Sequence, residues 1–315
     1  MKPSIAALQP EMQQIARKMP QVSISAKNLW FLRLMTKLFF KAPKMPAGIR
    51  VKNTFIASQD QKRQIRLRIY HPQVTSSNAP ALLWMHGGGY VIGLPEQDDL
   101  YVVPFIQELG VVVISVDYRL APDHPFPASL EDCYTALQWL AAQGMPGIDP
   151  HRIAVGGDSA GAGLAAALAQ IAHDRGEIRP VFQLLVYPML DDRTAARKDI
   201  DPQANLAWTN TSNCFGWESY LNQPCGAETV PGGSVPARRA DLSGLPPTWI
   251  GVGSNDLFYD EDVAYAQRLN EAGVPCELVI VPGAFHGFDI PAPEMQVVKN
   301  FRNSQVQALK NVLMG

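Results

Sequence analysis

The sequence predicts an α/β fold in which a mostly parallel sheet carries helices on both faces. Two observations support this class. From about residue 51 onward, short apolar runs alternate with helical patterns, which is typical of a parallel sheet. The segment Gly157-Asp158-Ser159-Ala160-Gly161 also has the form G-x-S-x-G, which marks a sharp turn between a strand and a helix. A chain of 315 residues is long enough to bury the core of such a domain.

The predicted strands are of two kinds. Residues 64–70 alternate with period two, which predicts a half-exposed strand with Arg66, Arg68 and Tyr70 on its outer face. The later strands are continuous apolar runs, as expected for strands that are covered on both faces. These runs span residues 81–85, 111–116, 153–155, 182–187, 248–252 and 278–281.

Helical patterns occur at residues 130–142, 160–173, 260–272 and 295–313. Two segments depart from the alternation. Residues 1–45 contain two amphipathic helical patterns, and residues 190–240 separate two strands by more than an ordinary connection. They are either surface insertions or a cap over the carboxyl ends of the strands, where α/β sheets bind ligands. We favour the cap, which assigns residues 1–50 and 190–240 to it and residues 51–189 and 241–315 to the main domain.

Composition excludes several classes of protein. The net charge of −2 gives no reason to expect nucleic-acid binding. The apolar stretch at residues 29–40 is short and carries two positive charges, so no stable membrane insertion is expected. No secretory signal is recognisable, which predicts a cytoplasmic protein. No C-x-x-C pair is present, so we expect free thiols and no metal site from the scattered cysteines Cys133, Cys214, Cys225 and Cys276.

Ser159, in the G-x-S-x-G turn, is the candidate nucleophile. Such a turn exposes the serine hydroxyl beside the N-terminus of the following helix. A serine hydroxyl is a poor nucleophile at neutral pH, so it needs a base within hydrogen-bond reach and a third group that orients the base. The sequence therefore predicts a Ser-His-Asp triad.

Elimination selects the other two members of the triad. Only His173 and His286 follow Ser159, and His173 lies about 20 Å along the helix that begins at the serine. His286 follows the last predicted strand, so it is the candidate base. Asp256 comes first in the loop after the preceding strand and is the predicted orienter. Asp260 is the alternative, although it belongs to the start of the next helix, where acidic groups favour the positive end of the dipole.

A run of three glycines after the strand at residues 81–85 predicts an oxyanion hole. Backbone without Cβ atoms can approach a substrate closely and direct N–H groups at a developing negative charge. We expect the N–H groups of Gly88 and Gly89 to act together with that of Ala160, and Gly87 is the less favoured donor.

Two neighbours of these motifs are predicted to be structural. His86 precedes the glycines and is expected to hold their loop by hydrogen bonds. Asp158 precedes the nucleophile, and its place on the turn directs its side chain away from Ser159. Glycines 156, 157, 161 and 163 have the wrong intervals for a G-x-G-x-x-G dinucleotide loop, so no nucleotide cofactor is expected.

The sequence resembles the hormone-sensitive lipase-like group of α/β-hydrolases, which includes many bacterial carboxylesterases. In one position the chain departs from the group, because Leu257 stands where the acid is usually followed by proline. Besides the serine turn and the glycine run, the resemblance rests on residues 117–122 (DYRLAP), 124–128 (HPFPA), 187–191 (YPMLD), 241–247 (DLSGLPP) and 286–288 (HGF).

The resemblance implies an eight-stranded, mostly parallel sheet, a helical cap and hydrolysis of carboxylic esters through an acyl-enzyme. It implies a small-molecule ester with a short to medium acyl chain, and no cofactor or metal. Similar proteins often pair along the last sheet edge, so a homodimer is one alternative to a monomer. Aromatic residues are expected to line the substrate pocket, namely Tyr90, Tyr187, Phe39, Trp208, Phe215 and Phe288.

Two other functions compete with ester hydrolysis. The same triad could cleave another acyl bond, such as an amide, a lactone or a carbamate, because the leaving group and the pocket shape decide between them. A ligand-binding receptor is the second alternative, since plant gibberellin receptors resemble this group but lack the catalytic histidine. The presence of Ser159, Asp256 and His286 favours an enzyme.

Overall fold

Eight strands form one sheet in the computed structural model of the protein, which describes residues 5–19, 22–40, 45–74, 77–201 and 205–315. The strand order is β1-β2-β4-β3-β5-β6-β7-β8. The β1–β2 and β2–β4 pairs are antiparallel and the remaining pairs are parallel, so the predicted α/β class is confirmed. The strands are Ile49–Ala57 (β1), Gln64–Pro72 (β2), Ala79–Met85 (β3), Val112–Asp117 (β4), Ile148–Asp158 (β5), Phe182–Val186 (β6), Thr248–Gly253 (β7) and Cys276–Val281 (β8).

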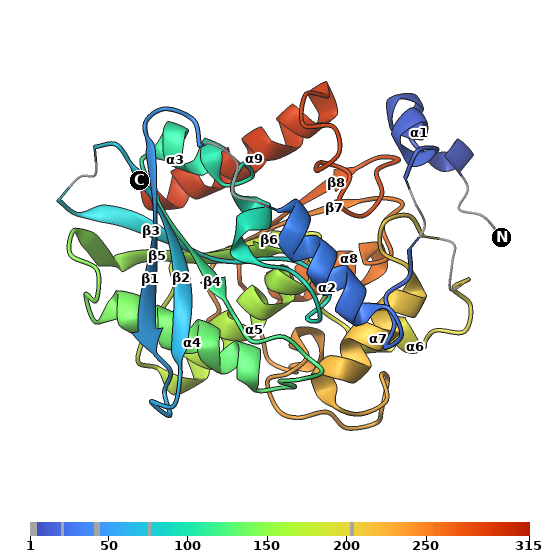
Figure 1. The fold of residues 1–315 in the computed structure, drawn as a ribbon, viewed down its shortest axis with the longest axis horizontal. Helices are drawn as coiled ribbons and strands as arrows, with labels where there is room; N and C mark the ends of the chain where they lie inside the picture. The colour runs from blue at the N-terminus through green and yellow to red at the C-terminus, as the bar shows by residue number, and fades with distance from the viewer. Residues whose placement is uncertain (1–4, 20–21, 41–44, 75–76, 202–204) are drawn as a thin grey trace.

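Helices cover both faces of the sheet (Figure 1). Helices α3 and α9 pack on one face, and α4, α5 and α8 pack on the other. Successive residues of a strand face opposite sides, so Val155 of β5 belongs to one apolar core and Ala154 to the other. The helices are α1 (Pro10–Ala16), α2 (Leu29–Phe39), α3 (Val103–Leu109), α4 (Ala128–Ala141), α5 (Ala160–Arg175), α6 (Asp192–Ala196), α7 (Asn210–Leu221), α8 (Tyr259–Glu271) and α9 (Gln296–Leu313).

Strand β1 and helix α3 of the main domain were not predicted from the sequence pattern. Strand β1 lies at the sheet edge, is largely exposed and carries several polar residues, so it gives no apolar run. Helix α3 is only seven residues long and contains a proline in its first turn, so it shows too few turns for a helical period.

The predicted half-exposed character of β2 is wrong for Arg68 and Tyr70, which are 6% and 0% exposed. The reason is a buried acceptor that the sequence pattern does not indicate. The Asp99 carboxylate accepts hydrogen bonds from Arg68 Nε and from the Tyr70 hydroxyl, each at 2.7 Å. A paired and hydrogen-bonded charge can be buried, whereas an isolated one cannot.

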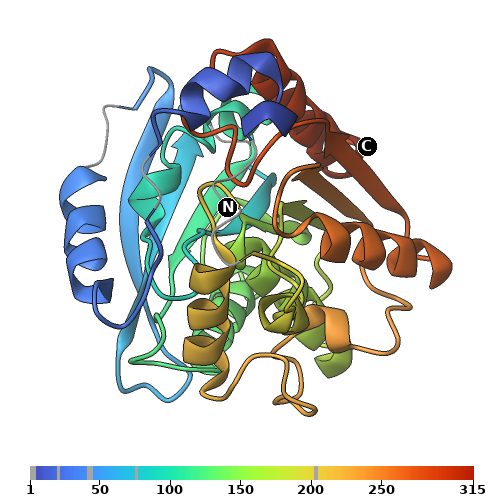
Figure 2. The ribbon, with the colours of Figure 1, turned by 90° about the vertical axis from the view of Figure 1, so that its right-hand side faces the viewer.

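The N-terminal segment and the 190–240 insertion contact each other beside the carboxyl ends of the strands, although residues 1–4, 20–21, 41–44 and 202–204 lie outside the described residues (Figure 2). The Ile24 N–H donates to Ser212 Oγ of α7 at 2.9 Å. At the other end of the N-terminal segment, the Gln9 N–H donates to the Gly283 carbonyl at 3.2 Å, in the loop that follows β8. Both segments therefore lie close to the loops that carry the candidate residues.

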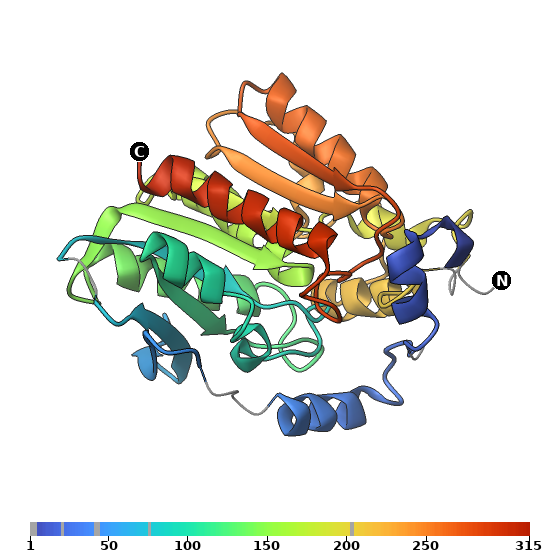
Figure 3. The ribbon, with the colours of Figure 1, turned by 90° about the horizontal axis from the view of Figure 1, so that it is seen from above.

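Helix α2 is apolar on two sides. Its inner side packs against the core through Leu29 and Leu32. Figure 3 shows the helix at the periphery of the molecule, and its outer side leaves Trp30, Phe31, Leu34, Leu38 and Phe39 exposed. Among the described residues, no helix has the length and apolar composition that crossing a bilayer requires.

Candidate active site

Ser159 occupies a tight turn between β5 and α5. Its backbone has φ 55° and ψ −121°, an unusual conformation for a residue with a side chain. Gly157 and Gly161 permit the turn, because a Cβ atom on them would lie 2.4 and 2.0 Å from the carbonyl oxygen of Met85. The Ser159 N–H donates to the Val186 carbonyl at 2.9 Å. The turn is therefore packed directly against the end of β3, from which the glycine run departs.

The structure brings Ser159, His286 and Asp256 into one chain of hydrogen bonds. His286 Nε2 lies 2.9 Å from Ser159 Oγ, and His286 Nδ1 lies 2.8 Å from Asp256 Oδ2. The second oxygen of Asp256 accepts the Phe258 N–H at 3.0 Å, which fixes the carboxylate. Since the Nδ1–H donates to the carboxylate, Nε2 is left as the acceptor that faces the serine hydroxyl.

Ser159 is only 6% exposed, which differs from the exposed hydroxyl that the motif predicts. His286 is also buried, at 7% exposure. Rings from three segments surround the His286 imidazole. The centroids of Tyr187, Phe258 and Trp208 lie 4.8, 5.1 and 6.5 Å from it. Trp208 belongs to the long insertion, so the sequence motif alone could not show this cover.

The reserve acid, Asp260, has a different partner. Its carboxylate pairs with Arg197 at 2.7 Å, and its side chain is 68% exposed. Helix α8 begins at Tyr259, so Asp260 lies in its first turn, as the sequence indicated. The geometry therefore joins His286 to Asp256 and not to Asp260.

The glycine run forms a tight loop beside the serine. Gly88 and Gly89 have φ values of 123° and 60°, which favour glycine. A Cβ atom on Gly88 would lie 2.1 Å from the Ile92 carbonyl oxygen, and one on Gly89 would lie 2.1 Å from the Trp208 ring. Within the part of the chain that the structure describes, the N–H groups of these two glycines have no hydrogen-bond partner. The N–H of Ala160, the first residue of α5, has no intrahelical acceptor either.

Gly87 differs from its neighbours, because it lies against the Asp158 side chain: a Cβ atom on Gly87 would lie 2.4 Å from Asp158 Oδ2. His86 is fully buried, stacks on Tyr118 at 4.2 Å and donates from Nδ1 to the Gly87 carbonyl at 2.8 Å. The Tyr118 hydroxyl in turn donates to the His86 carbonyl at 2.6 Å. His86 and Asp158 therefore both contact the backbone of the glycine loop at Gly87. Such contacts are what the structural roles predicted for these two residues require.

The aromatic residues predicted for the pocket separate into groups. Trp208 and Tyr187 lie against His286, as described above. Tyr90 is buried and stacks on Tyr220 of α7 with centroids 4.1 Å apart, and Phe215 of the same helix is half-buried against this core. Phe288 packs on Phe301 of α9 at 4.9 Å, within the core of the opposite face. Phe39 is 74% exposed at the end of α2, so the structure separates Phe39 and Phe288 from the others.

Three buried carboxyl groups, those of Asp98, Asp158 and Asp289, lie close enough for their charges to affect one another, and they were not predicted as a group. Burial, followed by the nearby charge of Asp289, raises the pKa of Asp158 to about 7. Burial likewise raises the pKa of Asp289 and, together with the charge of Asp158, that of Asp98. Asp98 accepts a hydrogen bond from the Trp84 indole at 2.9 Å. Because these acids come from distant segments, no sequence motif could have indicated the cluster.

We predict that acid stabilises this fold through Asp158. The folded chain keeps a proton at pH values where the unfolded chain has lost it, so this contribution is complete below about pH 4 and is lost as the pH rises through about 7. Its size is up to roughly 4 kcal/mol, because each pKa unit corresponds to about 1.4 kcal/mol. Asp158→Asn replaces the titrating carboxyl group with an amide of the same shape and should remove the part of the dependence that comes from Asp158, while Asp98 and Asp289 still contribute. Urea unfolding at about pH 5 and about pH 8 measures it, with Asp260→Asn as the control. Equal pH dependence in wild type and Asp158→Asn would contradict the assignment.

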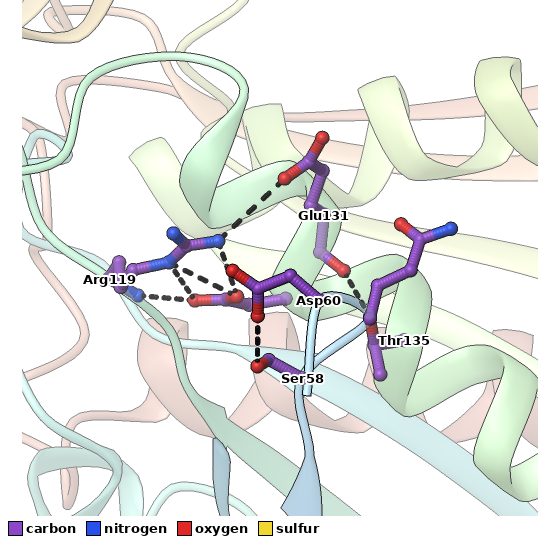
Figure 4. A pocket seen from close by; sticks show the side chains of 7 residues that line it. Ser58, Asp60, Arg119, Glu131 and Thr135 are labelled. Atoms are coloured by element: carbon purple, nitrogen blue, oxygen red, sulfur yellow. Dashed lines mark hydrogen bonds and ion pairs between the residues drawn. The ribbon is translucent and has the colours of Figure 1, made fainter. Parts of the chain in front are cut away.

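A hollow of about 260 Å³ lies around Arg119 of the DYRLAP segment, and none of the triad residues lines it (Figure 4). The arginine and aspartate side chains around this hollow form ion pairs and hydrogen bonds with neighbouring residues. Asp132 is buried and accepts hydrogen bonds from the Arg119 backbone and guanidinium at 2.9–3.2 Å, and it also pairs with Arg63. Ser58 donates to Asp60 at 2.6 Å. Through Asp132, these contacts join α4 to the turn between β1 and β2 and to the loop after β4, which gives the segment a structural role.

Comparisons with known proteins show the family to which the chain belongs. Residues 82–290 match the family model described as alpha/beta hydrolase fold. The chain is 31% identical over 291 residues to carboxylesterase NlhH of Mycobacterium tuberculosis, covering 91% of each protein. It is 34% identical to ethyl acetate hydrolase of Pseudomonas putida over 70% of each chain. Among solved structures, it is similar to esterase LipW from Mycobacterium marinum, with 34% identity, a TM-score of 0.88 and coverage of 100% of this chain and 99% of the other.

Proposed function

Since the chain belongs to the hormone-sensitive lipase-like group of α/β-hydrolases, we propose that it hydrolyses carboxylic esters with short to medium acyl chains through a Ser159–His286–Asp256 triad. The observation that carries the proposal is the continuous hydrogen-bond chain from Ser159 Oγ through both nitrogens of His286 to Asp256. Unlike a receptor that has lost its histidine, this chain retains the group that accepts the serine proton.

In the acylation step, Ser159 Oγ attacks the ester carbonyl carbon while its proton passes to His286 Nε2. The imidazolium that forms is stabilised by the Asp256 carboxylate, which stays charged. The carbonyl π electrons move to the oxygen and give a tetrahedral oxyanion. When this intermediate collapses, the bond to the alkoxy group breaks, and His286 returns the proton to the leaving alcohol. The products of this step are a free alcohol and an acyl-Ser159 ester.

The oxyanion is stabilised by the unpartnered N–H groups of Gly88, Gly89 and Ala160. Each such donor typically contributes roughly 3–4 kcal/mol of transition-state stabilisation in a buried site. Gly87 stays the less favoured donor, because the Asp158 carboxylate lies against its backbone. In the deacylation step, His286 Nε2 removes a proton from water while the water oxygen attacks the acyl carbon. On collapse, the bond from the acyl carbon to Ser159 Oγ breaks, and His286 returns the proton to Oγ, which releases the acid and regenerates Ser159.

The size of the substrate follows from the segments that cover the site. Trp208 stands against Gly89 and His286, so an acyl or alkyl group has a limited space before it meets the indole. One relative is named for ethyl acetate, an ester with a two-carbon acid. Because Trp208 of the insertion covers the site and the N-terminal segment contacts the insertion, we assign residues 1–50 and 190–240 to a cap. A cytoplasmic location and a homodimer remain predictions.

Activity is expected to peak at acyl chains of roughly two to eight carbons and to fall at greater length, because a closed pocket cannot accept additional methylene groups. Measuring kcat/KM on p-nitrophenyl esters of increasing chain length tests this, with the Ser159→Ala protein as the background. Amides of the same acids distinguish ester from amide cleavage. A steady rise to about sixteen carbons, with activation at an oil–water interface, would instead indicate a true lipase.

Trp208→Ala provides the matched variant for the same profile. Removing the indole should shift the optimum toward longer chains, whereas Trp30→Ala on the exposed side of α2 should leave the profile unchanged. An unchanged profile in Trp208→Ala would show that another residue limits the pocket.

A further inference from the structure

Two of the four cysteines lie side by side, which the sequence expectation of scattered thiols did not include. Cys214 Sγ, on helix α7, lies 3.1 Å from Cys225 Sγ, in the turn that follows this helix. This separation is about 1 Å longer than a disulfide bond, so a small side-chain rotation would bring the two sulfur atoms into bonding distance. Both cysteines are partly accessible to solvent.

The fold holds the turn that carries Cys225 in place. The Gly226 N–H donates to the carboxylate of Asp192 at 2.7 Å, and this buried carboxylate is paired with Arg238, also at 2.7 Å. A Cβ atom on Gly226 would lie 2.4 Å from that of Ala196, so the turn is packed closely against α6. The two sulfur atoms therefore meet through a fixed arrangement of α6, α7 and the turn.

A metal site is the first alternative for such a pair. Glu218, one turn after Cys214 on α7, offers a carboxylate oxygen within 4.8 Å of both sulfur atoms. Two thiolates at about 2.3 Å from a tetrahedral zinc ion would lie about 3.8 Å apart, which exceeds the observed separation. Glu218 is exposed, and among the described residues this group contains no fourth histidine, cysteine or acidic ligand. The geometry fits a dithiol better than a metal site.

The two thiols are also unequal. The hydrogen bond that the two sulfur atoms share lowers the pKa of Cys225 and raises that of Cys214. The thiolate is the reactive form of cysteine, so Cys225 is the first nucleophile of the pair.

We propose that Cys214 and Cys225 are a redox-active dithiol that low-molecular-weight disulfides convert to an intramolecular disulfide. The Cys225 thiolate attacks one sulfur of glutathione disulfide, breaks its S–S bond and releases one glutathione thiolate. Cys214 then loses its proton to solvent and attacks Cys225 Sγ, which releases the second glutathione. The two protein thiols lose two electrons, and one glutathione disulfide gains them to become two thiols.

The disulfide would link helix α7, which packs against the glycine loop, to the turn that follows this helix. A Cβ atom on Gly216 of α7 would lie 2.8 Å from the Gly89 carbonyl oxygen, and Trp217 packs against Tyr90 at 5.3 Å. The bond closes a short loop between α7 and its following turn, so it restrains the unfolded chain and should raise the melting temperature by a few degrees. This inference is independent of ester hydrolysis, because its chemical readouts do not use activity.

Incubating the reduced full-length protein with glutathione disulfide tests the proposal. We expect two of its four thiols to be lost, the mass to fall by two hydrogen atoms, and one cross-linked peptide to join Cys214 to Cys225. Cys214→Ser should instead retain one glutathione on Cys225, and neither this variant nor Cys225→Ser should gain melting temperature. Cys276→Ser is the matched control and should form the same bond as the wild type.

Three outcomes would overturn the proposal. Glutathione that stays attached to both cysteines of the wild type would show that the sulfur atoms cannot meet. Loss of thiols at Cys133 and Cys276 alone, or no reaction, would show that the pair is not redox-active. Zinc added in equal amount, if it remains bound after desalting and is lost only in the Cys214→Ser or Cys225→Ser variants, would assign a metal site in its place.

Discussion

Ser159→Ala is expected to lower kcat on a short-chain ester by roughly 10⁴- to 10⁶-fold, because it removes the oxygen that forms the acyl-enzyme. The fold should survive, since alanine takes the same space and the turn is held by backbone contacts such as the Ser159 N–H to Val186. Ester hydrolysis and thermal unfolding measured on the same sample separate the two effects. Ser243→Ala, at an exposed position, is the control and should keep full activity.

The same experiment extends to the base. His286→Ala should be nearly as damaging, and the Ser159→Ala/His286→Ala double variant should be little worse than either single one, because members of a triad act as a unit. Fully additive losses would show that the two residues act separately. Substantial residual activity in Ser159→Ala would transfer the nucleophilic role to another group.

Asp256→Asn is expected to lower kcat by about 10³- to 10⁴-fold while leaving the fold intact. The carboxylate accepts a hydrogen bond from His286 Nδ1–H at 2.8 Å, and an amide nitrogen at that place would favour the tautomer that carries its proton on Nε2. That tautomer presents a donor to Ser159 and cannot accept its proton.

Asp260→Asn provides the matched comparison, because it alters a nearby acid in the first turn of α8 whose partner is the exposed side chain of Arg197. We expect its kcat to stay within about twofold of the wild type, in keeping with the small energies of exposed ion pairs. A severe loss in Asp260→Asn together with near-normal activity in Asp256→Asn would assign the orienting role to Asp260.

Much of the fold could be predicted because a parallel sheet has a clear sequence pattern. Strands such as β3 and β7 are covered on both faces, so they read as continuous apolar runs. Strand β1 lies at an edge and shows no such run. Arg68 and Tyr70 resemble an exposed face, and only the long-range contact with Asp99 explains their burial.

The candidate site could also be predicted only in part: sequence order was enough for the triad but not for the residues that cover it. The order of serine, acid and histidine follows from which strand each residue comes after, so sequence order was enough to select Asp256 and His286. The cover over the site depends on how the insertion folds back, so the sequence could not distinguish Trp208, beside His286, from Phe39, on the outer side of α2. The meeting of Cys214 and Cys225 depends in the same way on the turn after α7.

The exposed outer side of α2 gives the protein an internal optical reporter. Trp30 is 67% exposed, Trp139 is half-buried, and Trp84, Trp208, Trp217 and Trp249 are buried at 7% exposure or less. In a Trp139→Phe background, iodide in the solvent reaches Trp30 and not the buried indoles, so the intrinsic fluorescence divides into a quenchable and a protected fraction. The emission of Trp30 follows the surroundings of the N-terminal segment, and the protected emission follows the integrity of the core. Emission spectra recorded with and without iodide therefore distinguish a displacement of α2 from loss of the native fold, without any added label.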